Sequence, residues 1–287
     1  MAENTESQTA VASQEIAPGA NGSVTGDLRL HEFRSRVFRN VRFLRVWLPP
    51  GYDDPGNSQQ YPVLYLNDGQ NLFDRSTAFT GVEWQVDETA DRLIREQKIP
   101  PMIIVGIDNA GDERLKEFLA YRSFNPPVLR PLGRKYPDFL LREVVPFIAQ
   151  RYRTAKGPEQ TGLGGSSLGA SISLYTAMAV PGVFGRLLLE SPSLFVSNRQ
   201  LLRDSRRFSQ WPERVFLAIG TREGGREDKD QETVDDVREL GETLRRAGLD
   251  DRRLLLRIDE GATHSEGAWA ARFPEAVTFL FGTEPEQ

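Results

Sequence analysis

The chain contains no cysteine among its 287 residues. Disulfide bonds, thiolate metal sites and a cysteine nucleophile are therefore excluded. It also lacks any run of 18 consecutive apolar residues, so we expect no membrane-spanning segment. No basic cluster stands out, and a net charge of −5 argues against binding nucleic acid through a basic face.

The start of the chain lacks the features of a secretory signal. Residues 1–25 are rich in Ser, Thr, Ala, Asn and Gly, with neither a basic start nor an apolar run. We expect a disordered polar tail over residues 1–25, a single domain over residues 26–282 and a short tail over residues 283–287. The predicted location is cytoplasmic.

The hydrophobic pattern of the domain predicts an α/β fold. Residues 28–35 and 41–50 alternate apolar and polar side chains, which indicates an antiparallel start of two half-buried strands. Short continuous apolar runs follow, typical of strands covered on both faces, and helical segments separate them. The predicted strands are 62–68, 101–108, 160–164, 186–191, 214–220 and 252–259. The predicted helices are 86–97, 138–152, 168–180, 230–248 and 265–281, the last interrupted at Pro274. The sum is a mostly parallel central sheet, with an antiparallel start, about five or six parallel strands and helices on both faces.

The stretch Gly165-Ser166-Ser167-Leu168-Gly169 is a G-x-S-x-G pentapeptide between a predicted strand and a predicted helix. In that context the glycines permit a sharp turn that raises Ser167 above the sheet edge as a candidate nucleophile. A plain glycine-rich connection is the alternative.

A serine hydroxyl needs a base within hydrogen-bond reach, and the chain has only two histidines. His264 follows the last predicted strand, as the order Ser, acid, His of α/β hydrolases requires. His31 belongs to the first, outer strand, where we expect a surface side chain. His264 could alternatively cap the helix that starts near Ser265.

The acid partner is expected in the loop after strand 214–220. Glu223 is our choice because it lies nearest the strand end, where the scaffold can fix its side chain. Its rivals are Glu227, Asp228 and Asp230.

The oxyanion hole is expected to use two backbone N–H groups. One belongs to Leu168, the residue after the nucleophile, and the other to Gln70 in the loop after strand 62–68. An ordinary turn at residues 68–71 is the alternative.

With these residues in view, the chain resembles the putative esterase family of α/β hydrolases. That group includes esterase D-like S-formylglutathione hydrolases, feruloyl and acetyl-xylan esterases, enterochelin-type siderophore esterases and mycolyltransferases. The likeness covers residues 27–281 in six ordered blocks: YPVLYLNDGQNLFD, EWQVDETADRLI, FLLREVVPFIAQRYRT, GGSSLGA, LAIGTREG and HSEGAW. It implies Ser167 as nucleophile, His264 as base, Glu223 as acid, and Gln70 with Leu168 as oxyanion donors.

The segment 111–137 is long for a connection in a compact domain, and we expect a loop near the active site. Between residues 118 and 136 it combines arginines with aromatic residues and has no acidic residue. Tyr121 and Arg122 are therefore candidate contacts for an aromatic or anionic group of the substrate. Trp269, five residues after His264, could wall the acyl pocket. The alternatives are that these side chains pin the loop to the domain and that Trp269 belongs to the core.

The sequence therefore predicts a serine carboxylic-ester hydrolase that works through an acyl-enzyme, without cofactor or metal. Feruloyl, acetyl-sugar or catecholate esters are the candidate small-molecule substrates. Acyl transfer on the same triad and a non-catalytic binding protein that keeps the fold are the alternatives. No nucleic-acid or membrane partner is expected, and the oligomeric state is left open.

Overall fold

A mixed nine-stranded sheet organises the part of the chain that the computed structural model describes, residues 15–16 and 23–282. Its strands lie in the order β1-β2-β3-β5-β4-β8-β9-β10-β11. Their bounds are β1 (Glu15–Ile16), β2 (Asp27–Arg34), β3 (Val41–Leu48), β4 (Val63–Asn67), β5 (Ile103–Ile107), β8 (Thr161–Ser166), β9 (Arg186–Glu190), β10 (Arg214–Arg222) and β11 (Leu254–Thr263). A separate two-stranded sheet pairs β6 (Ser123–Phe124) with β7 (Pro127–Val128).

The six neighbouring strands from β5 to β11 are mutually parallel. The edge formed by β1, β2 and β3 is antiparallel, and β3 joins it to β5. Every residue of β4, β5 and β9 is buried, as expected for strands covered on both faces. The predicted mostly parallel sheet with an antiparallel start is confirmed.

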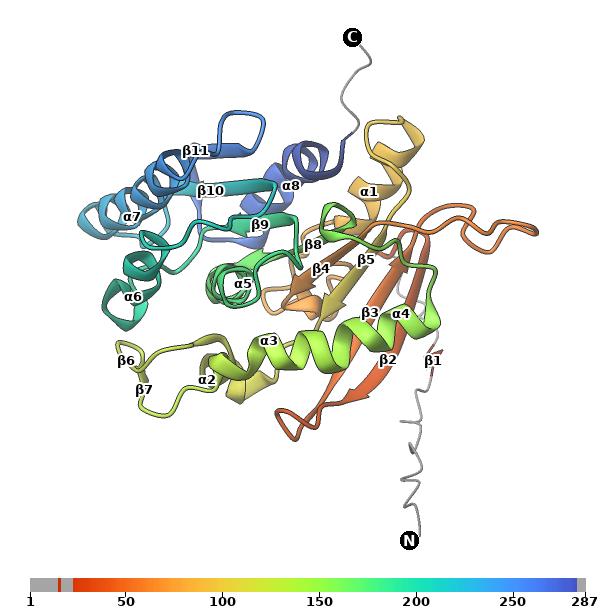
Figure 1. Ribbon diagram of the computed structural model, residues 1–287, viewed down its shortest axis with the longest axis horizontal. Coiled ribbons are helices and arrows are strands. Elements are labelled where there is room, and N and C mark those ends of the chain that lie inside the picture. Colours follow the sequence, from red (N-terminus) through yellow and green to blue (C-terminus); the bar gives the residue numbers. More distant parts are fainter. Residues whose placement is uncertain (1–14, 17–22, 283–287) are drawn as a thin grey trace, which may run out of the picture.

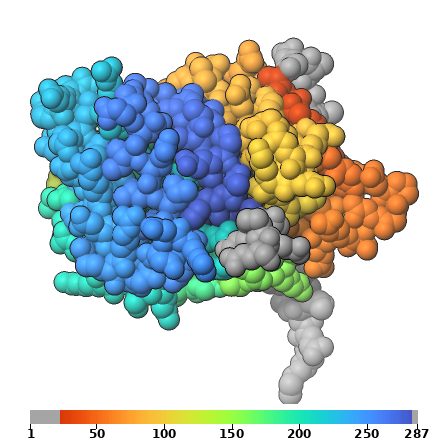
Figure 2. All heavy atoms as spheres, turned by 90° about the horizontal axis from the view of Figure 1, so that it is seen from above, coloured from red at the N-terminus to blue at the C-terminus, as the bar shows by residue number. Residues whose placement is uncertain are grey.

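Helices cover both faces of the sheet (Figure 1). Their bounds are α1 (Val86–Arg95), α2 (Arg114–Phe118), α3 (Tyr136–Phe139), α4 (Val145–Arg151), α5 (Leu168–Ala179), α6 (Val196–Ser205), α7 (Glu227–Arg246) and α8 (Glu266–Phe281). On one face α1 and α8 lie side by side, seen as the yellow and dark blue segments of Figure 2, and bury one hydrophobic cluster against the sheet. On the other face α3 to α7 bury a second cluster. None of the described helices is both long enough and apolar enough to cross a bilayer.

Several elements differ from the sequence prediction. Helix α8 continues through Pro274 because buried apolar side chains on both sides of it, Phe273 and Val277, pack on the sheet and hold the two halves in line. Helix α6 was not expected at all. The long segment 111–137 is also not a plain loop, because it contains α2 and the β6–β7 hairpin.

The amino-terminal boundary of the domain also needs correction. Strand β1 pairs with β2, although residues 15–16 were expected in the tail. Residues 23–25 are held to the domain as well: the carbonyl of Thr25 accepts a hydrogen bond of 2.8 Å from Trp47 Nε1, and its N–H donates to the Asp87 carboxylate. The rest of the expected tails, residues 1–14, 17–22 and 283–287, lies outside the described residues.

His31 is buried, although a surface position was expected. Its side chain is hydrogen-bonded through Nε2 to the hydroxyl of Tyr152 at 2.6 Å and meets the ring of Phe147 edge-on. Helix α4 and the residue after it cover this face of β2, and the alternating pattern of β2 gives no sign of that cover. His31 is thus a packed core residue.

Candidate active site

The turn from β8 to α5 holds Ser167 in a strained conformation. Its backbone has φ 55° and ψ −126°, a region that L-residues with a side chain rarely adopt. The turn passes close to β9: the Ser167 N–H donates to the carbonyl of Glu190 at 2.9 Å, and a Cβ at Gly164 would lie 2.6 Å from that of Leu188. Within the pentapeptide, a Cβ at Gly165 would lie 3.1 Å from Cβ of Asn67, and one at Gly169 would lie 3.1 Å from the Asp68 carboxylate. Close approach therefore favours glycine at both positions, and Ser167 stands at the carboxyl end of the strand.

His264 and Glu223 are joined by a hydrogen bond. Each follows directly after a strand, His264 after β11 and Glu223 after β10, and these two strands are neighbours. The imidazole Nδ1 is bonded to Oε2 of Glu223. The other carboxylate oxygen, Oε1, accepts from Ser191 Oγ at 2.7 Å and from the N–H of Gly220 at 2.8 Å.

The two members of this pair differ in exposure. The Glu223 side chain is 4% exposed, whereas that of His264 is 35% exposed and reaches the surface. Burial opposes ionisation of Glu223, but the interactions with His264, Ser191 and Gly220 outweigh it and hold its pKa below the ordinary value. Glu223 therefore faces the imidazole as a carboxylate at neutral pH.

The rival acids of the same loop have other surroundings. Glu227, Asp228 and Asp230 lie in the first turn of α7. Asp228 forms an ion pair with Arg226 at 2.6 Å, and Asp230 accepts a hydrogen bond from the N–H of Gly224. Of the four candidates in this loop, Glu223 is the one bonded to His264.

The hydroxyl of Ser167 has a different hydrogen-bond partner from the one expected. Its Oγ lies 3.2 Å from Oγ of Ser193, which follows β9. Within residues 23–282, no hydrogen bond joins Ser167 to His264. Both side chains nevertheless lie at the carboxyl edge of the same sheet, with β9 and β10 between their strands, and hydrogen bonds of catalytic groups are often completed only when substrate binds.

The loop after β4 is held in place by hydrogen bonds and by close packing against β5. Asp68 has a left-handed backbone, and its carboxylate accepts two hydrogen bonds of 2.7 Å from Arg114 and one of 2.7 Å from Asn109 Nδ2. A Cβ at Gly69 would lie 2.5 Å from the backbone of β5, so this loop needs a glycine there. The side chain of Gln70 accepts a hydrogen bond of 3.2 Å from the N–H of Asn109. The loop is therefore fixed beside the turn that carries Ser167, because β4 is the neighbour of β8.

Leu168 is the first residue of α5. The first N–H groups of a helix have no partner within the helix and point towards the space before it. The N–H of Leu168 is thus available to an oxygen atom that approaches Ser167.

The family described as Putative esterase matches residues 35–280 of this sequence. The chain belongs to the Putative esterase family. It is accordingly an enzyme of the hydrolase class, and its α/β fold is the one seen in solved esterases.

Individual relatives of the esterase are distant in sequence. "Uncharacterized protein YbbA" of Bacillus subtilis (strain 168) is 24% identical over 262 residues, which cover 90% of this chain and 97% of that protein. "Iron(III) salmochelin esterase" of Escherichia coli O6:H1 is 26% identical over 225 residues, covering 73% of this chain and 48% of that protein.

Solved structures show the same fold. The enterobactin esterase FES from Shigella flexneri, crystallised in the presence of enterobactin, has a TM-score of 0.68 at 18% identity. The likeness covers 92% of this chain and 62% of that one, so the esterase spans only part of the Shigella enzyme. The siderophore hydrolase EstB from Aspergillus nidulans has a TM-score of 0.69 at 16% identity, covering 89% of this chain and 95% of that one.

The three residues predicted to bind substrate differ in their burial and in their contacts with the candidate site. Trp269 is buried, and its ring meets the imidazole of His264 edge-on with 5.0 Å between centroids. Tyr121 is half-buried and donates a hydrogen bond of 2.6 Å to Asp204. Arg122 is exposed. Trp269 is thus in contact with the candidate site, as well as being part of the core.

The aromatic residues between 118 and 136 serve mainly to hold this segment of the esterase to the domain. Phe118 and Tyr136 are buried and pack edge-to-face, and the Tyr136 hydroxyl donates to Asn67 at the end of β4. Arg134 donates to the carbonyl of Ala120. In contrast, the side chain of Phe124 at the tip of the hairpin is exposed.

The sequence reasoning did not single out the serines after β9 or the support of the oxyanion loop. Ser191 and Ser193 follow a predicted strand whose carboxyl end meets the same sheet edge as Ser167. Their position at the carboxyl end of that strand is the sequence feature from which these two serines could have been predicted as site residues. The Asp68–Arg114 pair joins residues 46 positions apart, and the sequence contains no sign of it.

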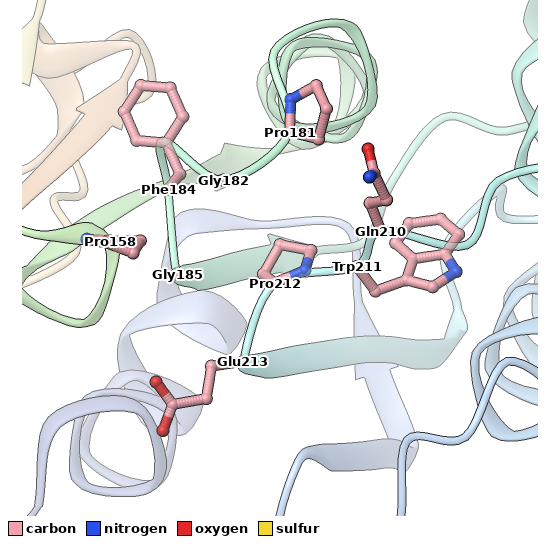
Figure 3. A pocket seen from close by; sticks show the side chains of 9 residues that line it. All are labelled: Pro158, Pro181, Gly182, Phe184, Gly185, Gln210, Trp211, Pro212 and Glu213. Atoms are coloured by element: carbon pink, nitrogen blue, oxygen red, sulfur yellow. The ribbon is translucent and has the colours of Figure 1, made fainter.

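A surface pocket of about 330 Å³ lies at the other end of the strands (Figure 3). Its lining includes Pro158, Phe184, Trp211 and Glu213, which precede β8, β9 and β10. Because Ser167 follows the carboxyl end of β8, this pocket belongs to the opposite edge of the sheet. It is therefore separate from the candidate active site.

No group of three or more His, Cys, Asp or Glu side chains within the described part of the chain is arranged to hold a metal ion.

Proposed function

We propose that this esterase hydrolyses carboxylic esters through an acyl-enzyme on Ser167, with His264 as base and Glu223 as its acid partner. The observation that carries the proposal is the hydrogen bond between His264 Nδ1 and the buried carboxylate of Glu223, at the sheet edge where a strained turn presents Ser167. This is the arrangement of base and orienting acid that serine nucleophiles require.

The first half of the reaction forms the acyl-enzyme. His264 Nε2 takes the proton of Ser167 as Oγ attacks the ester carbonyl carbon. The N–H groups of Leu168 and Gln70 stabilise the negative charge that develops on the carbonyl oxygen. The bond to the leaving alkoxide then breaks, and the imidazolium gives its proton to the departing alcohol.

The second half repeats these steps with water. His264 takes a proton from water, the resulting hydroxide attacks the acyl carbon, and the imidazolium returns the proton to Ser167 as the carboxylic acid leaves. The reaction requires Ser167 Oγ to exchange Ser193 for His264 Nε2.

The substrate class is proposed from two features. Arg122, just before β6, and Phe124, in β6, are both exposed, and a guanidinium together with an aromatic ring suits a planar or anionic group. Similar proteins are titled as esterases of enterobactin, salmochelin and ferulic acid. We therefore propose esters of aromatic acids, including catecholate and feruloyl esters, ahead of acetylated sugars.

The test combines turnover with detection of the intermediate. The protein and its Ser167→Ala variant are assayed with short-chain p-nitrophenyl esters, with Ser209→Ala, an exposed serine, as the matched control. We expect Ser167→Ala to lose at least a thousandfold in kcat, and a rapid-quench mass measurement to find the acyl group on the peptide containing Ser167. Equal rates for the protein and Ser167→Ala would refute the proposal.

A substrate panel then tests the substrate class. Feruloyl, catecholate and acetyl-sugar esters are compared by kcat/KM. We expect the two aromatic classes to exceed the acetyl-sugar esters, and the reverse order would refute the proposed substrate class without affecting the mechanism.

A further inference from the structure

The turn after β9, residues Ser191-Pro192-Ser193, lies between the two halves of the proposed catalytic site. Strand β9 is placed between β8, which leads to Ser167, and β10, which leads to Glu223. The turn is fixed on both sides: the Ser191 N–H donates to the carbonyl of Ala218 in β10 at 2.8 Å, and the Ser193 N–H donates to the carbonyl of Ser167 at 3.3 Å.

The hydroxyl of Ser191 is hydrogen-bonded both as a donor and as an acceptor. Ser191 is 2% exposed, and its Oγ donates to Oε1 of Glu223 at 2.7 Å while accepting from Nε1 of Trp269 at 3.0 Å. An indole N–H can only donate, so the single hydroxyl proton of Ser191 must point to the carboxylate. The ionised carboxylate of Glu223 can only accept, so both partners of the Ser191 hydroxyl favour the same direction, and Trp269 occupies the acceptor side of the serine oxygen.

Trp269 contacts both Ser191 and His264. Its ring meets the imidazole of His264 edge-on, with centroids 5.0 Å apart and planes at 86°. Glu223 is thus bonded to Ser191 through Oε1 and to His264 through Oε2, while the indole contacts both of these partners. Each of the four side chains limits the freedom of the next.

The backbone of Ser191 indicates that its position is maintained by these contacts. Its φ of 44° is in the left-handed region, which a residue other than glycine occupies at a cost. A glycine would relieve the strain but would have no hydroxyl to offer Glu223.

We propose that Ser191 is a positioning residue, which fixes the carboxylate of Glu223, and through it the imidazole of His264, with its hydroxyl oriented by Trp269. The inference rests on the proposed triad. Ser191 itself touches no reacting atom, so it acts on turnover rather than on substrate binding.

Replacement of Ser191 by alanine tests this role. A hydrogen bond to a charged group contributes enough for its loss to lower kcat by about 10- to 100-fold, and we expect KM to remain within about twofold. The Ser191→Gly variant relieves the left-handed backbone and should lose the same factor, because it also lacks the hydroxyl. Ser209→Ala is the control for the loss of a serine at an exposed position.

Trp269→Phe provides a second test that leaves the Ser191 hydroxyl in place. The phenyl ring keeps an aromatic contact but has no N–H to orient the serine, so we expect a smaller loss in kcat, of about 3- to 10-fold. In the double variant Ser191→Ala/Trp269→Phe the loss should not exceed that of Ser191→Ala by more than about twofold, because the two residues act through one hydrogen bond.

The proton between His264 and Glu223 gives a readout independent of rate. It should appear as a strongly downfield imidazole N–H signal in the proton NMR spectrum, and it should shift or broaden in Ser191→Ala. Wild-type kcat together with an unchanged downfield signal in Ser191→Ala and Ser191→Gly would overturn the inference. If Ser167→Ala is active, the proposed function fails; if Ser167→Ala is inactive but Ser191→Ala is fully active, only the role of Ser191 fails.

Discussion

The substitution Glu223→Gln removes the negative charge of the proposed triad and replaces one acceptor oxygen by a donor NH₂ group, while preserving the shape of the side chain. Oε1 of Glu223 accepts hydrogen bonds from Ser191 Oγ at 2.7 Å and from the N–H of Gly220 at 2.8 Å. Since both partners donate, the oxygen of the new amide must occupy this position, and its NH₂ group must face His264.

That orientation fixes the wrong form of the imidazole. An amide NH₂ donates to Nδ1, so the ring proton moves to Nε2, the atom that should accept the proton of Ser167. The variant also removes the negative charge that would stabilise the imidazolium. We therefore expect kcat to fall about 10⁴-fold, the loss found when a triad carboxylate becomes an amide, with KM little changed.

The measurement is steady-state hydrolysis of p-nitrophenyl acetate across pH 6 to 9, with Glu227→Gln as the matched control. Glu227 belongs to the same loop and is exposed at the start of α7, so its amide variant should retain wild-type activity. Circular dichroism and thermal unfolding establish that Glu223→Gln is folded. A folded Glu223→Gln variant within tenfold of the wild-type kcat would refute the assignment of Glu223 as the acid.

Two further predictions concern the support of the site and the stability of the fold. Arg114→Met removes both hydrogen bonds that Arg114 donates to the buried Asp68, so we expect kcat to fall about tenfold and the free energy of unfolding to fall by about 2 kcal/mol. Lys116→Met, at an exposed position on α2, is the control. Equal values of kcat and of the free energy of unfolding for the two variants would contradict the role of the Asp68–Arg114 pair. Burial raises the pKa of Glu83 to about 7 and raises that of Asp87 as well. Between about pH 4 and 7 the folded state therefore holds protons that the unfolded state has lost, and its free energy of unfolding should fall as pH rises, by at most about 1.4 kcal/mol per pH unit for each group. Urea unfolding from pH 5 to 8 should show a flatter dependence for Asp87→Asn than for the wild type, and parallel curves would contradict this account.

Much of the fold could be predicted because its strands are short, apolar and separated by helical spacing. The runs that became β4, β5 and β9 are buried along their whole length, which is the condition under which continuous apolar sequence identifies a strand. Elements whose stability depends on tertiary contacts could not be predicted. Helix α8 passes through Pro274, and β1 exists through its pairing with β2, two facts that no local pattern encodes.

The site was predictable to the extent that sheet topology determines it. Ser167, Glu223 and His264 each follow a predicted strand, and parallel strands bring their carboxyl ends to one edge. Side-chain packing across the sheet was not predictable. Nothing in the residues around His31 shows that α4 covers it, and nothing before Arg114 indicates that its guanidinium meets Asp68.

The order of the strands explains why neighbouring side chains in this site depend on each other so closely. From β8 to β11, spatial order equals chain order, and each strand end supplies part of the proposed site: Ser167, then Ser191 with Ser193, then Glu223, then His264. Adjacent parallel strands keep a spacing of about 4.8 Å, so the residues that end one strand lie nearest to the residues that end its neighbours. Ser167 and Glu223 are two strands apart, and the turn after β9 is the element that can contact both. A site built in this way should tolerate changes in its surrounding helices better than changes in that turn.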